Sequence, residues 1–223
     1  MLQISNTEPI GVGDDRAVYR HPGESRQCIK IAKCNFNKDF RIQGVRDRLF
    51  YLSRLGRMEY FDYNFNDVLY AEALAARSSD EVFRHLPRCF GWVDTDLGKG
   101  VAWELLTDFD GSLCATLKDC SFNPGLLGHG DEEEERQILK QALNEFFAWQ
   151  IHHAIMLREM AYINTHVCRL DPDTIRLYHI DAIGCVDLFP LASHARWFSR
   201  LRVRSKVHQF RKKMETWLGP LSK

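Results

Sequence analysis

The stretch LREMAYINTHVCRLDPDTIRLYHIDAIG, residues 157–184, decides the fold of this chain. Near its start, Arg158 is followed by the acidic residue Glu159, and Asn164 lies five residues after Glu159. A run of mostly bulky residues at 175–180 predicts a short strand. Asp181 follows that strand, 17 residues after Asn164. Because Asp and Gly near a strand end are common in turns, Asp181 indicates a function only if other parts of the chain supply partners.

Two glycines upstream lie in a pattern of short strands. Residues 9–33 predict strand, turn, strand, turn and strand, and the first turn holds Gly11 and Gly13. Glycines allow a backbone to approach phosphate oxygens closely. A strand follows the turn and no GK[ST] sequence appears, which disfavours a dinucleotide fold and a P-loop. The same glycines would also suit a plain hairpin turn.

Lys30 stands in the third of these strands and is flanked by apolar residues. A lysine that points into a protein needs a partner. A helix predicted over 66–80, capped by Asn66 or Asp67, carries the candidate partner, Glu72. A Lys–Glu pair of this kind can hold nucleotide phosphates. The alternative is an edge-strand lysine and a solvated glutamate.

Three more segments have clear patterns. Residues 90–106 predict a hairpin around the turn DTDLGKG, and 130–156 predict a long amphipathic helix. The acidic run 131–135 suits the positive end of that helix. A second helix is predicted over 194–218, with one basic side that is typical of solvated surface and less often of a site for an anionic partner.

The order of these features is that of a protein kinase. Both glycines and Val18 fit the pattern G-x-G-x-x-G-x-V, with Arg16 in place of the third glycine. Residues 157–164 have the form H-R-D-L-x-x-x-N, with Leu for His and Glu for Asp. Asp181 stands where the D-F-G sequence would follow. Each feature is weak alone, but the whole series in this order is hard to obtain by chance.

The predicted fold is therefore α+β and protein-kinase-like, with two lobes. Residues 1–107 form a β-rich N-lobe that includes the helix called αC in kinases and an extra helical insertion at about 35–66. Residues 108–223 form a reduced, mainly helical C-lobe. Only 42 residues follow Asp181, so a full activation segment and the usual C-lobe helices are not expected.

Four stretches resemble one bacterial family: PIGVGDDRAVYRHPGESRQCIKI (9–31), LPRCFGWVDTDLGKGVAWELLTDFDG (86–111), IDAIG (180–184) and PLASHARW (190–197). The hairpin TDLGKG followed by DFDG is the most specific piece. With these stretches the chain resembles the YrbL-like PhoP regulatory network proteins, which are small proteins with a kinase-like fold. The resemblance implies a two-lobed kinase-like fold and a cytosolic bacterial protein, and it implies little about the substrate.

A kinase-like site would hold ATP in the N-lobe. Val18 and the strand residues around Ile29 would cover the base, and the segment 104–108 would be the hinge. Glu104 and Leu106 would offer backbone hydrogen bonds to adenine. Lys30, oriented by Glu72, would contact the phosphates, together with the loop of Gly11 and Gly13.

The C-lobe would supply the metal and the chemistry. Asn164 and Asp181 would hold Mg²⁺ through oxygen ligands, which suit a hard cation. Glu159 would accept the proton of an attacking hydroxyl. Ala161 stands where active kinases have Lys, so a cation near the transferred phosphate is missing. Two functions stay open: a phosphotransferase of low or unusual activity on an unknown acceptor, and a pseudokinase that acts as a regulatory binding module.

Composition limits the other classes of function. The formal net charge is zero, so the overall charge gives no reason to expect nucleic acid or an anionic membrane as a partner. No apolar run approaches the roughly 20 residues of a membrane span, and the N-terminus lacks the features of a secretory signal, so a cytoplasmic protein is expected. Seven cysteines with no CxxC pair predict free thiols rather than a disulfide framework or a zinc site.

Overall fold

The computed structural model describes most of the chain and divides it into two compact units. Unit 1 takes its described residues from 1–79, 87–105 and Gly184, and unit 2 takes them from 80–86, 106–183 and 196–221. The main division after Leu105 lies two residues before the expected lobe boundary. The described residues are 1–33, 44–54, 56–76, 80–123, 125–128, 131–184 and 196–221.

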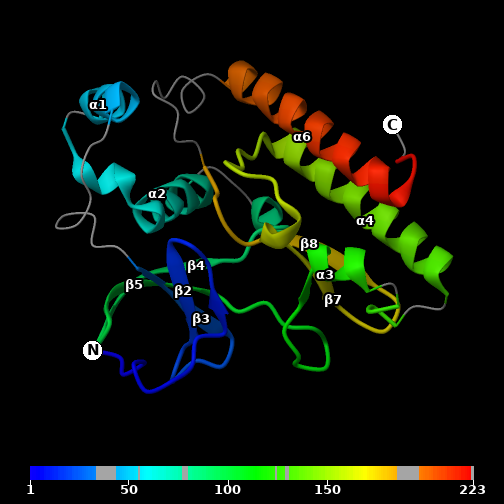
Figure 1. Cartoon of the computed structure of the whole chain (residues 1–223), viewed down its shortest axis with the longest axis horizontal. Coiled ribbons are helices and arrows are strands. Elements are labelled where there is room, and N and C mark those ends of the chain that lie inside the picture. Colours follow the sequence, from blue (N-terminus) through cyan, green and yellow to red (C-terminus); the bar gives the residue numbers. More distant parts are fainter. Residues whose placement is uncertain are drawn as a thin grey trace. The chain divides into compact units, whose positions relative to one another are not determined.

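Unit 1 contains a five-stranded antiparallel sheet with the order β1-β2-β3-β5-β4 (Figure 1). The predicted series of strands in 9–33 and the predicted hairpin are both present. The hairpin turn is tighter than expected, because the strands continue to the residues on either side of Asp96 and Leu97. The strands are β1 (Gly11–Val12), β2 (Arg16–Arg20), β3 (Gln27–Ala32), β4 (Cys89–Thr95) and β5 (Gly98–Glu104).

The alternation of side chains along β3 gives this sheet two different faces. Ile29 and Ile31 pack with Ile4 in an apolar cluster on one face. A Cβ atom at Gly100 would lie 2.5 Å from Ile31 and 2.7 Å from Ile29, so only glycine fits there. Helix α2 (Tyr63–Ala75) packs against β3, β4 and β5 and makes its polar contacts with the other face.

The helical insertion of unit 1 contains α1 (Gly44–Ser53) and the short 3-10 helix η1 (Met58–Phe61). The part of the predicted insertion at 35–43 lies outside the described residues. Helix α2 then begins earlier than predicted. Its N-cap is Asp62, whose carboxylate accepts a hydrogen bond from the backbone N–H of Asn64 at 2.8 Å. The predicted caps at 66 and 67 are therefore inside the helix.

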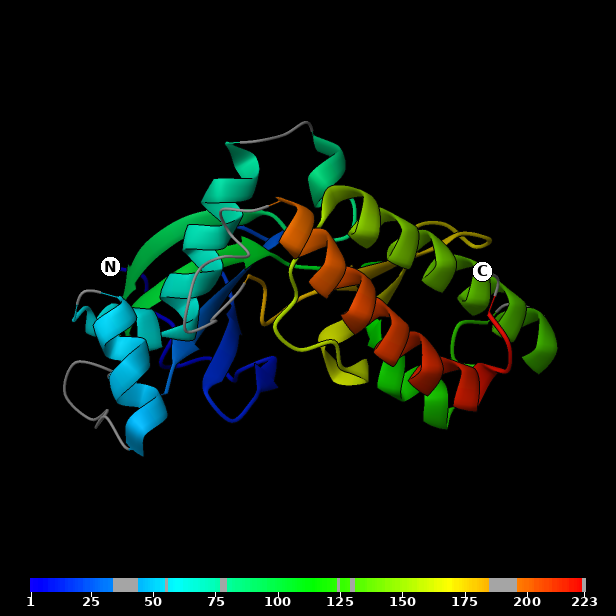
Figure 2. The same ribbon diagram turned by 90° about the horizontal axis from the view of Figure 1, so that it is seen from above.

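Unit 2 is built around two long helices, α4 (Glu132–His153) and α6 (Arg196–Leu218). They run side by side in opposite directions (Figures 1 and 2). Asp131 caps α4, and Ala154 ends it with a left-handed backbone at φ 53°. Most of the apolar face of α4 is buried, whereas Leu201 of α6 is 55% exposed. Within the described part of the chain, no helix combines the length and the apolar content that crossing a membrane requires.

A small sheet of unit 2 has the order β6-β7-β8. It consists of β6 (Ala115–Thr116), β7 (Thr165–Arg169) and β8 (Ile175–His179), and only β8 was predicted. Short helices adjoin it: α3 (Leu117–Phe122) follows β6, and the 3-10 helix η3 (Tyr162–Asn164) precedes β7. A further 3-10 helix, η2 (Asp80–Phe83), belongs to the same unit. This sheet positions the candidate site.

Candidate functional site

The hairpin of β7 and β8 brings Asn164 and Asp181 to the same end of the small sheet. Thr165 pairs with His179 in the antiparallel register, and the backbone N–H of Ile180 donates to the carbonyl oxygen of Asn164 at 2.9 Å. Asp181 is the next residue along the chain. Both candidate side chains are half-buried. Two oxygen-bearing side chains thus start from neighbouring backbone positions, although 17 residues separate them in the sequence.

The loop of Glu159 belongs to the same substructure. The backbone N–H of Arg158 donates to the carbonyl oxygen of Ala182 at 2.6 Å, and Leu157 forms a β-bridge with Ile183. Ala182 has a left-handed backbone at φ 55°, which turns the chain directly after Asp181. Glu159 itself is exposed. The structure therefore brings the H-R-D-like loop and the D-F-G-like turn together within unit 2.

Lys206 of α6 holds this loop. Its ammonium donates to the carbonyl oxygens of Leu157 at 2.7 Å and of Arg158 at 2.6 Å. The sequence pattern had placed Lys206 among solvated basic side chains, and that interpretation is wrong for this residue. Hydrogen bonds from a charged donor are stronger than neutral ones. The C-terminal helix therefore fixes the backbone beside Glu159.

Asn164 and Asp181 suit a hard cation, because both present oxygen ligands. Among the described residues, no group of three or more His, Cys, Asp or Glu side chains gathers as a metal site would require. Mg²⁺ is compatible with that count, since it is usually held by one or two protein groups together with water and substrate phosphates. The arrangement fits Mg²⁺, and its binding stays a prediction.

In unit 1, Lys30 lies in the middle of β3 with its side chain 5% exposed. It pairs directly with Val18 of β2, so the two side chains share one face of the sheet. Its Nζ lies 5.2 Å from the centroid of the Trp103 ring. Burial, and to a smaller extent Arg16, lowers the pKa of Lys30 to about 8, while Asp67 acts in the opposite direction. Ile29 points to the other face, so it does not cover a base on the side of Val18.

Glu72, the predicted partner of Lys30, is exposed on α2. Among the ion pairs of the described residues, none joins these two side chains. The carboxylate that acts on Lys30 from α2 is Asp67, which is 1% exposed and lies 2.7 Å from Nη1 of Arg16. Sequence reasoning missed Asp67 because it had used this residue as a helix cap. Arg16 in place of the third glycine was the available signal.

The glycine turn connects β1 and β2. Gly11 pairs with Val18, and the backbone N–H of Gly13 donates to the carbonyl oxygen of Arg16 at 2.9 Å. A Cβ atom at Gly11 would meet nothing within 4 Å, and one at Gly13 would only reach the Arg16 oxygen at 3.7 Å. The turn therefore leaves room for another group to approach its backbone.

Backbone hydrogen bonds within unit 1 hold Glu104 and Leu105 of the predicted hinge. The backbone N–H of Glu104 donates to the carbonyl oxygen of Arg88 at 2.8 Å, and that of Leu105 donates to Arg26 at 2.9 Å. The thiol of Cys28, a weak donor, lies 3.9 Å from the carbonyl oxygen of Glu104. The contacts with adenine expected from Glu104 and Leu106 stay predictions, and the N–H of Glu104 has a protein acceptor already.

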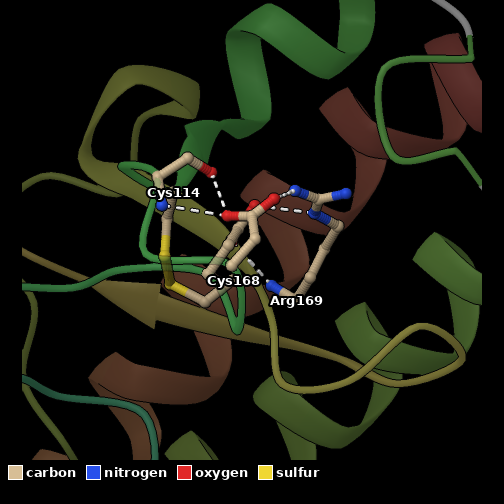
Figure 3. Close-up of polar contacts among 6 residues, drawn as sticks. Cys114, Cys168 and Arg169 are labelled. Carbon is tan, nitrogen blue, oxygen red and sulfur yellow. Dashed lines mark hydrogen bonds and ion pairs between the residues drawn. A yellow bond between two sulfur atoms is a disulfide. The ribbon is translucent and has the colours of Figure 1, made fainter.

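After the hinge, a disulfide and an arginine cluster connect 108–114 to β7. Cys114 and Cys168 form a disulfide, so the prediction of free thiols is wrong for this pair (Figure 3). Ala115 pairs with Val167, which places the two cysteines opposite each other at a Cα–Cα distance of 4.8 Å. The described free cysteines are Cys28, Cys89 and Cys120, and Cys34 and Cys185 lie outside the described residues.

Arg169, next to the disulfide, binds two carboxylates of the DFDG sequence (Figure 3). Its Nε donates to Asp108 at 2.7 Å and its Nη2 to Asp110 at 2.7 Å. The backbone N–H of Phe109 donates in turn to the carbonyl oxygen of Arg169 at 2.9 Å. Asp108 and Asp110 are thus structural partners of Arg169.

A groove on unit 2 lies away from all predicted site residues of that unit. It runs along η2 and α4 and does not include Glu159, Asn164 or Asp181. Its lining residues are Glu81, Arg84, His85, Glu145, Ala148, Trp149, His152 and His153.

Two solved structures are similar to this chain. The BubR1 kinase domain matches with a TM-score of 0.50 at 13% sequence identity, covering 82% of this chain and 48% of that chain. A mutant of the Mycobacterium tuberculosis PknI kinase domain matches with a TM-score of 0.41 at 14% identity, covering 80% of this chain and 59% of that chain. The likeness to the BubR1 kinase domain shows a kinase-like fold.

Sequence relatives define the family. The proteins called uncharacterized protein YrbL from Escherichia coli (strain K12) and from Shigella flexneri are each 26% identical to this chain over 201 residues. The match covers 88% of this chain and 80% of each relative. The family model of the PhoP regulatory network protein YrbL matches residues 2–215. This chain therefore belongs to the PhoP regulatory network protein YrbL family.

Proposed function

We propose that this protein binds ATP with Mg²⁺ through its kinase-like fold and acts as a phosphotransferase on an acceptor that is not identified. The observation that supports the proposal is the register of β7 and β8, in which the backbone of Asn164 bonds to Ile180, the residue before Asp181. Supporting it, Lys30 is buried on the same sheet face as Val18.

Each residue has a role in this proposal. Lys30 donates hydrogen bonds to phosphate oxygens, and with a pKa of about 8 roughly nine tenths of it is protonated at pH 7. Asn164 and Asp181 ligate the metal, and Val18 covers the base. Bound Mg²⁺ supplies positive charge at the phosphates. Glu159 is exposed beside this group and is the candidate acceptor for the hydroxyl proton.

A pseudokinase is the second candidate, because the catalytic loop lacks two groups of active kinases. Ala161 replaces the loop lysine, and Leu157, which replaces the histidine, is fully buried. Loss of one preorganised charge at the transferred group costs roughly 10²–10³ in kcat. The loop is nevertheless held in place by Lys206. As a pseudokinase, the protein binds nucleotide and metal but does not transfer a phosphoryl group.

Nucleotide binding is tested by thermal unfolding with ATP, with and without Mg²⁺. We expect ATP to raise the Tm of the wild type more with Mg²⁺ than without it. Lys30→Met should lose the shift in both conditions, whereas Asp181→Asn should lose only the part that depends on the metal. Asp173→Asn, at an exposed carboxylate between β7 and β8, is the matched control and should behave as the wild type. A wild type that responds to neither ATP nor Mg²⁺ contradicts the proposal.

Transfer is tested separately by release of phosphate or ADP from ATP. Under the phosphotransferase proposal, the wild type turns over slowly and Glu159→Gln lowers kcat without changing the Kd for ATP. Turnover that survives Glu159→Gln unchanged would remove Glu159 as the proton acceptor. Binding without any turnover would favour the pseudokinase.

A further inference from the structure

A buried polar cluster of unit 1 surrounds the backbone of Lys30 and consists of Arg16, Asn64 and Asp67. Nη1 of Arg16 donates to Asp67 at 2.7 Å and to Oδ1 of Asn64 at 3.1 Å. Nδ2 of Asn64 donates to the carbonyl oxygen of Lys30 at 3.3 Å. These contacts connect β2, β3 and α2. Arg16, Lys30, Asn64 and Asp67 are each at most 7% exposed as whole residues, with Asn64 and Asp67 at 1%.

Burial makes this cluster sensitive to the loss of any member. Removing one partner of a buried ion pair leaves the other charge uncompensated, which is strongly destabilising. Arg16 and Asp67 satisfy each other, and Asn64 serves both Arg16 and the backbone of Lys30. The orientation of α2 relative to β2 and β3 is therefore fixed by polar contacts as well as by apolar packing.

The geometry of α2 separates Asp67 from Glu72. Five residues along an α-helix correspond to a rotation of about 140°. The buried positions 64, 67, 68, 71 and 74 form one face, which packs against the sheet. Glu72 lies off that face and is exposed. The helix can therefore direct Asp67 or Glu72 at the sheet, but not both, and it directs Asp67, which binds Arg16 of β2.

The surroundings of Lys30 agree with this geometry. After burial, the largest effects on its ammonium come from Arg16 of β2, which lowers the pKa, and from Asp67 of α2, which raises it. Cys28 of β3 and Cys89 of β4 raise it as well. Trp103 of β5 contributes its ring face.

We propose that Arg16 and Asp67 are the positioning pair of Lys30, in the role that the sequence pattern assigns to Glu72. The inference rests on the proposed function, since it concerns the lysine that would bind phosphate. Asp67 holds the ammonium of Lys30 on the inner face of the sheet, and Arg16 holds Asp67. A rotation of α2 that broke the Arg16–Asp67 pair would release Lys30 as well.

The test follows the titration of Lys30 in the protein without nucleotide. Lysine labelled with ¹³C and ¹⁵N reports the titration by NMR, and Lys30→Arg identifies the signal by its loss. Because an opposite charge nearby favours the charged form, Asp67→Asn should lower the pKa of Lys30 by on the order of one unit. Arg16→Gln removes a like charge and should raise it. A merely structural role would not give opposite signs in the two variants.

Two further variants complete the design. Glu72→Gln should leave the titration of Lys30 where it is in the wild type, and so should Asp94→Asn at an exposed carboxylate of β4. If Asp67→Asn does not fold, Arg16→Gln decides alone: a rise in the pKa supports the pair and no change overturns it. The inference is also overturned if Glu72→Gln shifts the titration as far as Asp67→Asn does.

Nucleotide binding separates this inference from the proposed function. With ATP and Mg²⁺, Asp67→Asn should weaken binding by about tenfold, which is the effect of roughly 1.4 kcal/mol, while Glu72→Gln should stay within twofold of the wild type. If neither the wild type nor any variant binds ATP, the proposed function fails. The titration of Lys30 then still decides whether Asp67 or Glu72 positions this lysine.

Discussion

His85 is a buried neutral histidine whose burial links stability to pH. The side chain is 2% exposed and its Nδ1 lies 2.7 Å from the carbonyl oxygen of Leu177. Desolvation lowers the pKa of His85 from 6.5 to about 4. Below pH 6.5 the unfolded chain therefore takes up a proton that the folded protein excludes, so stability falls as the pH falls from 6.5 to 4. The full effect is about 3 kcal/mol.

Urea unfolding between pH 7 and pH 4 measures this dependence. His85→Gln should flatten the decline, since glutamine does not titrate. His152→Gln, at an exposed position of α4, is the control and should keep the slope of the wild type. If the free energy of unfolding of His85→Gln declines with falling pH as steeply as that of the wild type, His85 is not the source of the pH dependence.

At the scale of residues, the sequence indicated which lysine points inward but not its partner. Lys30 could be selected because apolar residues flank it in a strand. The face of α2 that turns toward the sheet could not be predicted, because it depends on the packing of Val68, Ala71 and Leu74 against the sheet. Asp67 therefore looked like a helix cap, and Glu72 looked like the partner. Only tertiary contacts distinguish the two.

The segment 107–114 is an element that the disulfide fastens to β7. The cross-link of Cys114 to Cys168 spans 54 residues, for which a stabilisation of about 2–4 kcal/mol is typical. We expect Cys114→Ser and treatment with a dithiol reductant to lower the free energy of unfolding by similar amounts. Cys89→Ser, at a half-buried free thiol of unit 1, should not reproduce the effect.

Intact mass after alkylation without reductant gives the independent check. The account expects Cys114 and Cys168 to stay unmodified until the reductant is added. Alkylation of both before reduction, with no change in stability on reduction, would show that the disulfide does not form in solution.

The loop 157–161 is an element whose position depends on Lys206. Hydrogen bonds to charged groups contribute roughly 1.5–3 kcal/mol each, less where water reaches them. Lys206→Met should therefore increase hydrogen exchange in this loop and lower the Tm. Lys212→Met, at an exposed position of the same helix, serves as the comparison. Equal exchange in the two variants would mean that the contacts of Lys206 do not hold the loop.

At the scale of elements, long periodic helices were predictable and the small sheet was not. The apolar period of α4 is visible along its 22 residues, whereas β6 has only two residues. Residues 165–169 have no clear alternation, so β7 exists because it pairs with β8 and β6. The disulfide follows from the same pairing. Contacts between distant segments leave little trace in a local pattern.

The whole molecule has the kinase-like fold that the order of its motifs predicted. That order could be read from one sequence because each motif needs a particular strand, turn or helix beside it. The family was predictable for the same reason, through the DFDG and IDAIG stretches. Binding of ATP and Mg²⁺ and the identity of the acceptor could not be predicted in the same way. They depend on side chains whose contacts form only when the chain folds.

Calorimetric titration of ATP with Mg²⁺ into four proteins tests the central claim most directly. The four are the wild type, Lys30→Met, Asp181→Asn and the double variant. If Lys30 and Asp181 both contribute to nucleotide binding, each single change weakens binding by about tenfold or more, and the double variant binds more weakly than either single variant. Absence of binding in the wild type, or unchanged binding in either single variant, would contradict the account.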